Sequence, residues 1–210
     1  MLISEIFHSL QGEGPCAGLP AAFIRLSGCV EPLCPWCDTP YALAGGTEMD
    51  LEPILRAVSA RSFRRAVITG GEPFLQWDAG LSGLHEALIS QGIEVQYETS
   101  GKIRIPIIED ALVVCSPKHI AGAWRFDEEN VRAVHVFKFT ADGTAKGFEA
   151  IDGFIAEHGL DAEKVCIMPL GATRREQLST MEPVFAYCLE KGYRMSPRLQ
   201  VLTFDTRRGI

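Results

Sequence analysis

RAVITGGEP, residues 65–73, is the stretch that decides the fold: an apolar run ends in two glycines, a glutamate and a proline. A short, nearly continuous apolar run is typical of a parallel β-strand that is buried on both faces. The Gly-Gly-acid-Pro sequence predicts a turn directly after the strand. In open parallel sheets, ligand sites collect at the carboxyl ends of the strands. The stretch therefore predicts a strand with a functional turn at its end.

Five other apolar stretches repeat this strand pattern. They are AAFIRLSG at 21–28, IEVQYET at 93–99, ALVVCSPK at 111–118, AVHVFKFT at 133–140 and KVCIMPL at 164–170. Strands that alternate with helices predict an α/β protein with a mostly parallel sheet and right-handed crossover connections. A complete barrel of this class has eight strands. Six strands therefore predict a partial, open (β/α)6 barrel.

Two helical patterns lie between and after these strands. Asp78 is placed to cap a helix whose leucines at positions 81, 84 and 88 fall on one face. Thr173 and Glu176 have the spacing of a capping box, and Gly192 marks the end of that second helix. Pro183 is expected to kink or restart it.

Length, composition and charge limit the kind of protein. The chain has 210 residues, of which 47% are hydrophobic and 22% charged, and no linker divides it, so we expect one domain over 1–210. With 20 basic and 27 acidic residues, no global field favours nucleic acid or anionic membrane. Glu5 and His8 argue against a signal peptide, and no apolar run approaches the roughly 18 residues of a membrane helix. We expect a cytoplasmic protein.

Three of the seven cysteines have ligand spacing. Cys29, Cys34 and Cys37 form a C-x4-C-x2-C pattern, whereas the cysteines at positions 16, 115, 166 and 188 are scattered singly. A closed structural zinc site needs four protein ligands. Three thiolates can instead hold three irons of a [4Fe–4S] cluster and leave the fourth iron for an exogenous ligand. The alternatives are an incidental group of thiols or an incomplete zinc site.

The cysteine pattern, Trp36 beside Cys37, and TGGEP at 69–73 together resemble the radical S-adenosylmethionine (SAM) enzymes. The resemblance implies an open barrel of the radical SAM type. It also implies that SAM chelates the unique iron and that reductive cleavage yields a 5′-deoxyadenosyl radical. Gly70, Gly71 and Glu72 would bring backbone groups to the methionyl ammonium. The usual spacing in these enzymes is C-x3-C-x2-C, one residue shorter than here.

Longer segments resemble one family of radical SAM enzymes, the 7-carboxy-7-deazaguanine synthases. These segments are EIFHSLQGEGPCAGLPAAFIRLSGC at 5–29, WCDT at 36–39, ETSG at 98–101, SPK at 116–118 and SPRLQVLTFDTRRGI at 196–210. The resemblance implies a lyase that converts 6-carboxy-5,6,7,8-tetrahydropterin to 7-carboxy-7-deazaguanine with loss of ammonia, in queuosine and other 7-deazapurine biosynthesis. The implied cofactors are a [4Fe–4S] cluster, SAM and Mg²⁺. Where this family commonly has histidine after Arg-Leu, the chain has Gln200.

The same resemblance implies the site residues. The cluster ligands would be Cys29, Cys34 and Cys37, and Thr39 would bind Mg²⁺. SAM would be bound by Trp36, Cys37, Asp38, Gly71, Ser116, Pro117, Lys118, Met168, Pro169, Leu170 and Gly171, with Thr99 and Ser100 near its ribose. The substrate would be bound by Leu10, Gln11, Gly12, Glu13, Arg25, Thr69 and the carboxylate of Ile210, which would fold back after a strand-like LQVLTF at 199–204.

Side-chain chemistry supports part of this assignment. Arg25 offers a planar fork for a substrate carboxylate, and Gln11 and Glu13 can pair with the donor–acceptor edge of a guanine-like ring. The structural alternatives are a strand arginine that extends to solvent, a capping or turn role for Thr39, and a frayed end at Ile210.

The expected partners are a small pterin substrate, an electron donor such as a flavodoxin or ferredoxin, and a second copy of the chain in a homodimer, with no nucleic acid and no membrane. Two other functions use the same cysteines. One is a radical SAM activase that modifies a glycyl-radical enzyme, and the other is a non-catalytic zinc or iron–sulfur module. Iron and sulfide analysis would separate the zinc module from the others.

Overall fold

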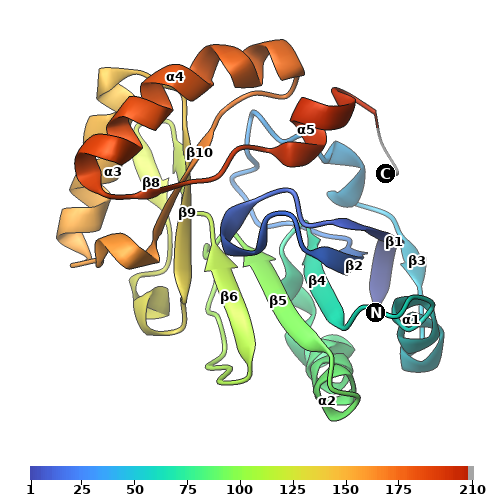
Figure 1. Cartoon of the computed structure of the whole chain (residues 1–210). Coiled ribbons are helices and arrows are strands. Elements are labelled where there is room, and N and C mark those ends of the chain that lie inside the picture. The colour runs from blue at the N-terminus through green and yellow to red at the C-terminus, as the bar shows by residue number, and fades with distance from the viewer. Residues whose placement is uncertain (208–210) are drawn as a thin grey trace.

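A nine-stranded sheet forms the centre of the computed structural model, which describes residues 1–207 (Figure 1). Its strand order is β11-β10-β9-β6-β5-β4-β2-β1-β3. The bounds are β1 Leu2–Leu10, β2 Pro20–Leu26, β3 Thr47–Glu48, β4 Arg65–Gly70, β5 Glu94–Thr99, β6 Ala111–Cys115, β9 Val136–Ala141, β10 Val165–Pro169 and β11 Arg194–Met195. Neighbouring strands from β11 to β2 are parallel, while β1 pairs antiparallel with both β2 and β3.

The predicted fold class is confirmed. All six apolar stretches form strands, and each lies in the parallel part of the sheet. The sheet has two edges, β3 and β11, so it is an open partial barrel. β1, β3 and β11 are not predicted from the sequence. Neither is the small hairpin of β7 (Lys118–Ile120) and β8 (Ala123–Arg125).

Helices cover one face of the sheet. They are α1 Leu51–Val58, α2 Ser82–Ser90, α3 Ala145–Glu157 and α4 Arg174–Lys191, and α5 (Leu199–Phe204) follows in the C-terminal segment. The main core includes Ile24, Ile68, Tyr97 and Phe137 from the strands, together with residues of these helices such as Phe154. None of the helices in residues 1–207 is both long and apolar enough to cross a bilayer.

The helix predictions had mixed outcomes. The capping box of Thr173 and Glu176 is formed, and Gly192 ends α4 in the left-handed conformation. However, α4 continues through Pro183 without restarting. Asp78 does not cap α2: it lies in the preceding π-turn, Trp77–Leu81, and α2 begins at Ser82. The leucines at 81, 84 and 88 are nevertheless fully buried, as their spacing predicted.

The predicted strand at 199–204 is wrong, because this stretch is α5. A six-residue apolar run cannot be assigned to strand or helix from periodicity alone. A tertiary contact holds its start, where the N–H of Leu199 donates to the carbonyl of Gly12 at 3.0 Å. The N–H of Leu202 then donates to the carbonyl of Arg198 at 3.0 Å, which is a helical i to i−4 hydrogen bond. In Figure 1 the red chain that leads into α5 passes above the carboxyl ends of β5 and β6.

The opposite face of the sheet carries the polar residues. Because side chains alternate along a strand, Gln96 and Glu98 point away from the core that holds Tyr97, and Lys138 points away from Phe137. A small apolar cluster of Ala21, Phe23, Val67 and Phe7 lies apart from the main core. This alternation places charged groups inside the open barrel.

Candidate active site

Two loops meet on the polar side of the sheet. The N-terminal loop, residues 11–19, connects β1 to β2, and the C-terminal segment, residues 196–207, follows β11. The N–H of Gly14 donates to the Ser196 hydroxyl at 2.6 Å. A side chain at Gly14 would lie 3.8 Å from Cδ of Lys138, so the N-terminal loop lies directly against the strand face. The loop therefore presents its own side chains to the charged residues of the sheet.

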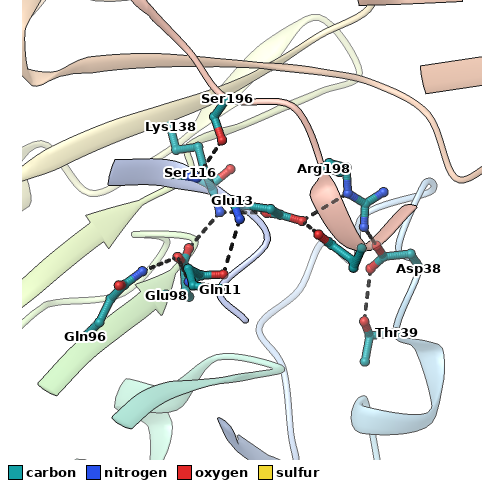
Figure 2. A network of polar contacts seen from close by, with 12 residues as sticks. Gln11, Glu13, Asp38, Thr39, Gln96, Glu98, Ser116, Lys138, Ser196 and Arg198 are labelled. Carbon is teal, nitrogen blue, oxygen red and sulfur yellow. Dashed lines mark hydrogen bonds and ion pairs between the residues drawn. The ribbon is translucent and has the colours of Figure 1, made fainter. Parts of the chain in front are cut away.

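A buried ion-pair network joins the N-terminal loop to the sheet (Figure 2). The ammonium of Lys138 donates to Glu13 at 2.8 Å and to Glu98 at 2.9 Å, and the Lys138 side chain is only 5% exposed. Gln96 and Gln11 donate to the other oxygen of Glu98 at 2.8 and 3.3 Å. One lysine thus forms ion pairs with two carboxylates inside the barrel.

The network continues through Arg198 to the segment after the cysteines. Arg198 donates to Glu13 at 3.0 Å, to the carbonyl of Gly171 at 2.9 Å, and to Asp38. The hydroxyl of Thr39 donates to Asp38 at 3.0 Å. In Figure 2 Arg198 lies between Glu13 and Asp38. Asp38 directly follows Cys37, so Arg198 links the cysteine segment to the interior of the barrel.

The protonation of these groups follows from burial and from their neighbours. Burial alone would raise the pKa of Glu13, but Lys138 and Arg198 hold it well below its ordinary value. Burial would likewise lower the pKa of Lys138, but Glu13 and Glu98 raise it above its ordinary value. For Glu98, burial outweighs Lys138, and its pKa is raised. Glu13 is therefore a fixed anion, whereas Glu98 binds a proton more readily than an exposed carboxylate.

The cysteine loop, residues 29–37, lies at the carboxyl end of β2. Cys29, Cys34 and Cys37 are free and partly exposed. The N–H of Cys37 donates to the carbonyl of Cys34 at 3.1 Å. Burial raises the pKa of the Cys29 thiol. The remaining cysteines, at 16, 115, 166 and 188, are free and buried, as expected of residues that pack.

The TGGEP turn packs directly against the start of the cysteine loop. A side chain at Gly71 would lie 1.6 Å from the carbonyl oxygen of Gly28, and one at Gly70 would lie 2.1 Å from that of Leu26. Gly70 also has a φ of 132°. The protein's own backbone therefore requires these glycines, independently of any ligand. They let β4 and the cysteine loop approach each other closely.

Glu72 of the same turn is fully buried and connects it to β5. Its carboxylate accepts hydrogen bonds from the hydroxyl groups of Thr99 and Ser100, both at 2.6 Å, and from the N–H of Ser100 at 2.9 Å. Its own N–H donates to the carbonyl of Gly28 at 2.8 Å. Thr99 and Ser100, expected near a ribose, are thus engaged by Glu72.

The donor set fits the cofactors that the sequence implies. Within residues 1–207, no three His, Cys, Asp or Glu side chains converge on a single ion position. A cubane cluster does not require such convergence, because each thiolate binds a different iron. Three free thiols without a fourth cysteine on the same loop suit a cluster better than a closed zinc site. The Thr39 hydroxyl oxygen, beside Asp38, is of the type that Mg²⁺ takes while it keeps several waters.

Arg25 lies inside the barrel but has an internal partner. Its Nε donates to Glu5 at 2.7 Å, and the hydroxyl of Tyr41 donates to the same Glu5 oxygen at 3.0 Å. No other hydrogen bond of the Arg25 guanidinium is formed within the described residues, so its terminal nitrogens remain for a ligand. Thr69 is the register partner of Arg25 across β2 and β4. This arrangement suits a carboxylate at the carboxyl end of these strands.

The other predicted residues lie around the same edge, with exceptions. Ser116, Pro117 and Lys118 follow β6, and Lys118 donates to the Ser116 hydroxyl at 2.8 Å. Burial lowers the pKa of Lys118.

Met168 and Pro169 end β10, followed by Leu170 and Gly171. Trp36 and Leu10 are 42% and 54% exposed, and the network does not include Leu10. Ile210 lies outside the described residues.

Gln200, at the position where the resemblance implies histidine, also reaches the network. Its amide donates to Glu13 at 2.7 Å. A side chain at Gly12 would lie 1.7 Å from Oε1 of Gln200, so Gly12 makes room for it. Gln200 therefore places a hydrogen-bond donor beside Glu13.

The sequence reading missed Glu98, Lys138 and Arg198 as network members. A signal existed for two of them. Lys138 interrupts the apolar run AVHVFKFT, and Glu98 is the last residue but one of IEVQYET. A charge inside a buried strand needs a partner. Arg198 offers no comparable signal, because its neighbours have no clear periodicity.

The fold and the site together define a class: an open α/β-barrel protein with a buried charged site next to a three-cysteine loop at the carboxyl edge of its sheet. No family model matches the chain. A 7-carboxy-7-deazaguanine synthase from Aquifex aeolicus is 40% identical over 124 residues, which cover 57% of this chain and about half (55%) of the relative.

A 7-carboxy-7-deazaguanine synthase from Pyrobaculum aerophilum is 32% identical over 219 aligned positions, which cover 99% of this chain and 96% of the relative. The crystal structure of QueE from Escherichia coli superposes with a TM-score of 0.80 at 26% identity and covers 94% of this chain and 93% of that chain. The chain therefore belongs to the 7-carboxy-7-deazaguanine synthase family.

Proposed function

We propose that the protein is a radical SAM lyase that converts 6-carboxy-5,6,7,8-tetrahydropterin to 7-carboxy-7-deazaguanine with loss of ammonia, for queuosine or another 7-deazapurine. One observation supports this above all. Arg198 joins Asp38, which follows the cysteines, to Glu13 inside the barrel. A cofactor on the cysteine loop and a substrate on the buried network would therefore be neighbours.

A [4Fe–4S] cluster and SAM, when bound, would supply the one-electron chemistry that begins the ring contraction. The ligands for the cluster are Cys29, Cys34 and Cys37. The SAM-binding segments predicted from the sequence are the ends of β6 and β10 and the turn at Gly71. These segments and the cysteine loop all follow the carboxyl ends of parallel strands of one sheet, which is the usual place for a ligand site in such folds.

The substrate would be oriented by groups of fixed charge. Ionised Glu13 accepts hydrogen bonds and suits the amino and N–H groups of a pterin, and Gln11 offers an amide beside it. The terminal nitrogens of Arg25 suit the carboxylate, with Thr69 next to it. Glu98 has a raised pKa, so it can hold or release a proton beside the substrate.

Mg²⁺ would be bound by the Thr39 hydroxyl and by the substrate carboxylate, with waters completing the shell. Asp38 accepts hydrogen bonds from both Thr39 and Arg198, so its role is to orient these two side chains. The cluster must be reduced by one electron before it can act, and we propose a flavodoxin or ferredoxin as the donor. The homodimer expected from the sequence is a prediction that the mass in solution tests.

The test is anaerobic reconstitution with iron and sulfide, followed by incubation with the carboxypterin, SAM, Mg²⁺ and dithionite. We expect a product with the mass and ultraviolet spectrum of 7-carboxy-7-deazaguanine. Cys34→Ala should lose both the cluster and turnover, whereas Cys16→Ala, which changes a buried packing cysteine, should keep both. Stoichiometric zinc in place of iron, or full turnover by Cys34→Ala, would contradict the proposal.

A further inference from the structure

Lys102 lies in the segment after β5, and its ammonium contacts the cysteine loop. It donates to the carbonyl of Pro32 at 2.7 Å and to that of Val30 at 3.1 Å. The same nitrogen lies 4.0 Å from Sγ of Cys34. An ammonium has three N–H donors. Two are used by the carbonyls, and the third is available for the sulfur.

Lys102 is itself attached to a rigid part of the molecule. Its backbone N–H donates to the Ser100 hydroxyl at 3.4 Å, and that hydroxyl donates to buried Glu72 at 2.6 Å. The N–H of Glu72 donates in turn to the carbonyl of Gly28, at the start of the cysteine loop. One connected set of hydrogen bonds thus holds residues 28–34 at both ends, through Glu72 at one end and Lys102 at the other.

We propose that Lys102 is a positioning residue that fixes residues 30–34 and places a positive charge beside the Cys34 sulfur, so that a cluster on this loop is easier to reduce. This inference rests on the proposed function, because it needs the cluster. Hydrogen bonds to the sulfurs, net charge and solvent exposure set the reduction potential of iron–sulfur clusters. Reduction adds a negative charge, which a nearby ammonium stabilises. Both carbonyls that accept from Lys102 belong to the four residues between Cys29 and Cys34.

The experiment compares four reconstituted proteins: wild type, Lys102→Met, Lys102→Arg and Lys146→Met. Lys146 is an exposed lysine on α3 and serves as the matched control. The midpoint potential of each cluster is measured by redox titration followed by electron paramagnetic resonance. We expect Lys102→Met to shift to a more negative potential, Lys102→Arg to stay near wild type because it keeps the charge, and Lys146→Met to be unchanged.

Hydrogen exchange of the cluster-free proteins gives a second readout. Lys102→Met should exchange faster at residues 30–34. Because this measurement needs no cluster, it still tests the role of Lys102 if the variant fails to take up iron. Unchanged exchange together with an unchanged potential would overturn the role of Lys102 and leave the proposed function intact. If wild type itself binds no cluster, the proposed function fails first, so the two failures are distinguishable.

Discussion

Glu98 is a buried carboxyl group whose environment disfavours the ionised form. Its pKa is raised above the ordinary 4.5, chiefly by burial, although Lys138 opposes the shift. Glu13, on the other side of the same lysine, has its pKa lowered because two cations face it. The two carboxyls therefore contribute to the pH dependence of stability with opposite signs.

A pH prediction follows for Glu98→Gln. A raised folded-state pKa gives stability that is present below pH 4.5 and is lost as the pH rises through the folded pKa, by at most about 1.4 kcal/mol per pH unit. The free energy of unfolding of wild type minus that of Glu98→Gln should therefore fall as the pH rises from 4.5 to 8. Urea denaturation at several pH values measures this slope. A pH-independent effect of the amide on stability shifts the difference but does not change its slope.

Glu86→Gln is the matched control for this series, since Glu86 is exposed on α2. Its difference from wild type should be flat over the same range. A flat difference for Glu98→Gln as well would show that Glu98 titrates like an exposed carboxyl.

Among single residues, the sequence predicts those whose chemistry is visible in local spacing. The three cysteines and the glycines at 70 and 71 belong to this group, and all lie at the carboxyl edge of the sheet. The partner of a buried charge depends instead on which strands are neighbours. Lys138 and Glu98 are 40 positions apart and meet only because β5, β6 and β9 are adjacent.

At the scale of elements, α4 is the helix whose start is best encoded. The Thr173 hydroxyl accepts from the N–H of Glu176 at 3.2 Å, and the Glu176 carboxylate accepts from the N–H of Thr173 at 3.1 Å. Thr173→Ala removes one half of this box, so the free energy of unfolding should fall by about 0.5–2 kcal/mol. Chemical denaturation measures the loss, and Thr173→Ser should restore most of it.

Ser179→Ala provides the control for this helix. Ser179 is exposed, and its hydroxyl donates to the carbonyl of Glu176 without capping a helix end. Its removal should change stability by less than about 0.5 kcal/mol. Equal losses for Thr173→Ala and Ser179→Ala would mean that the cap contributes no more than an ordinary surface hydroxyl.

The elements that the sequence left out share a physical cause. The buried strands are long apolar runs, whereas β3 and β11 have two residues each, and β1 carries polar residues such as Glu5 on its site-facing side. Neither a two-residue strand nor a mixed pattern gives a clear period. The apolar, β-branched composition of 199–204 predicts a strand, while the contact of Leu199 with Gly12 lies outside the local sequence.

At the scale of the whole molecule, the C-terminal segment joins parts of the site that are far apart in sequence. Arg198 contacts Glu13 of the N-terminal loop, Asp38 beside the cysteines and Gly171 after β10. Leu199 adds a backbone bond to Gly12. The site is therefore complete only when both ends of the chain have docked onto the barrel.

Arg198→Met should remove the contacts with Glu13, Asp38 and Gly171 at once. The Arg198 side chain is 14% exposed and faces ionised Glu13, so its loss should cost about 1–3 kcal/mol, as for a hydrogen bond to a buried charged group. Hydrogen exchange should rise at the amide of Leu199 and at residues 38–43, while the amides of β5 and β6 stay protected because their ladder is unchanged. Arg207→Met is the matched control, since Arg207 lies over the ring of Phe204 at 5.8 Å and makes none of these contacts. If Arg198→Met exchanged like Arg207→Met at both segments, the two ends of the chain would dock independently of Arg198, and the link from the cysteine loop to Glu13 would have no part in holding the site together.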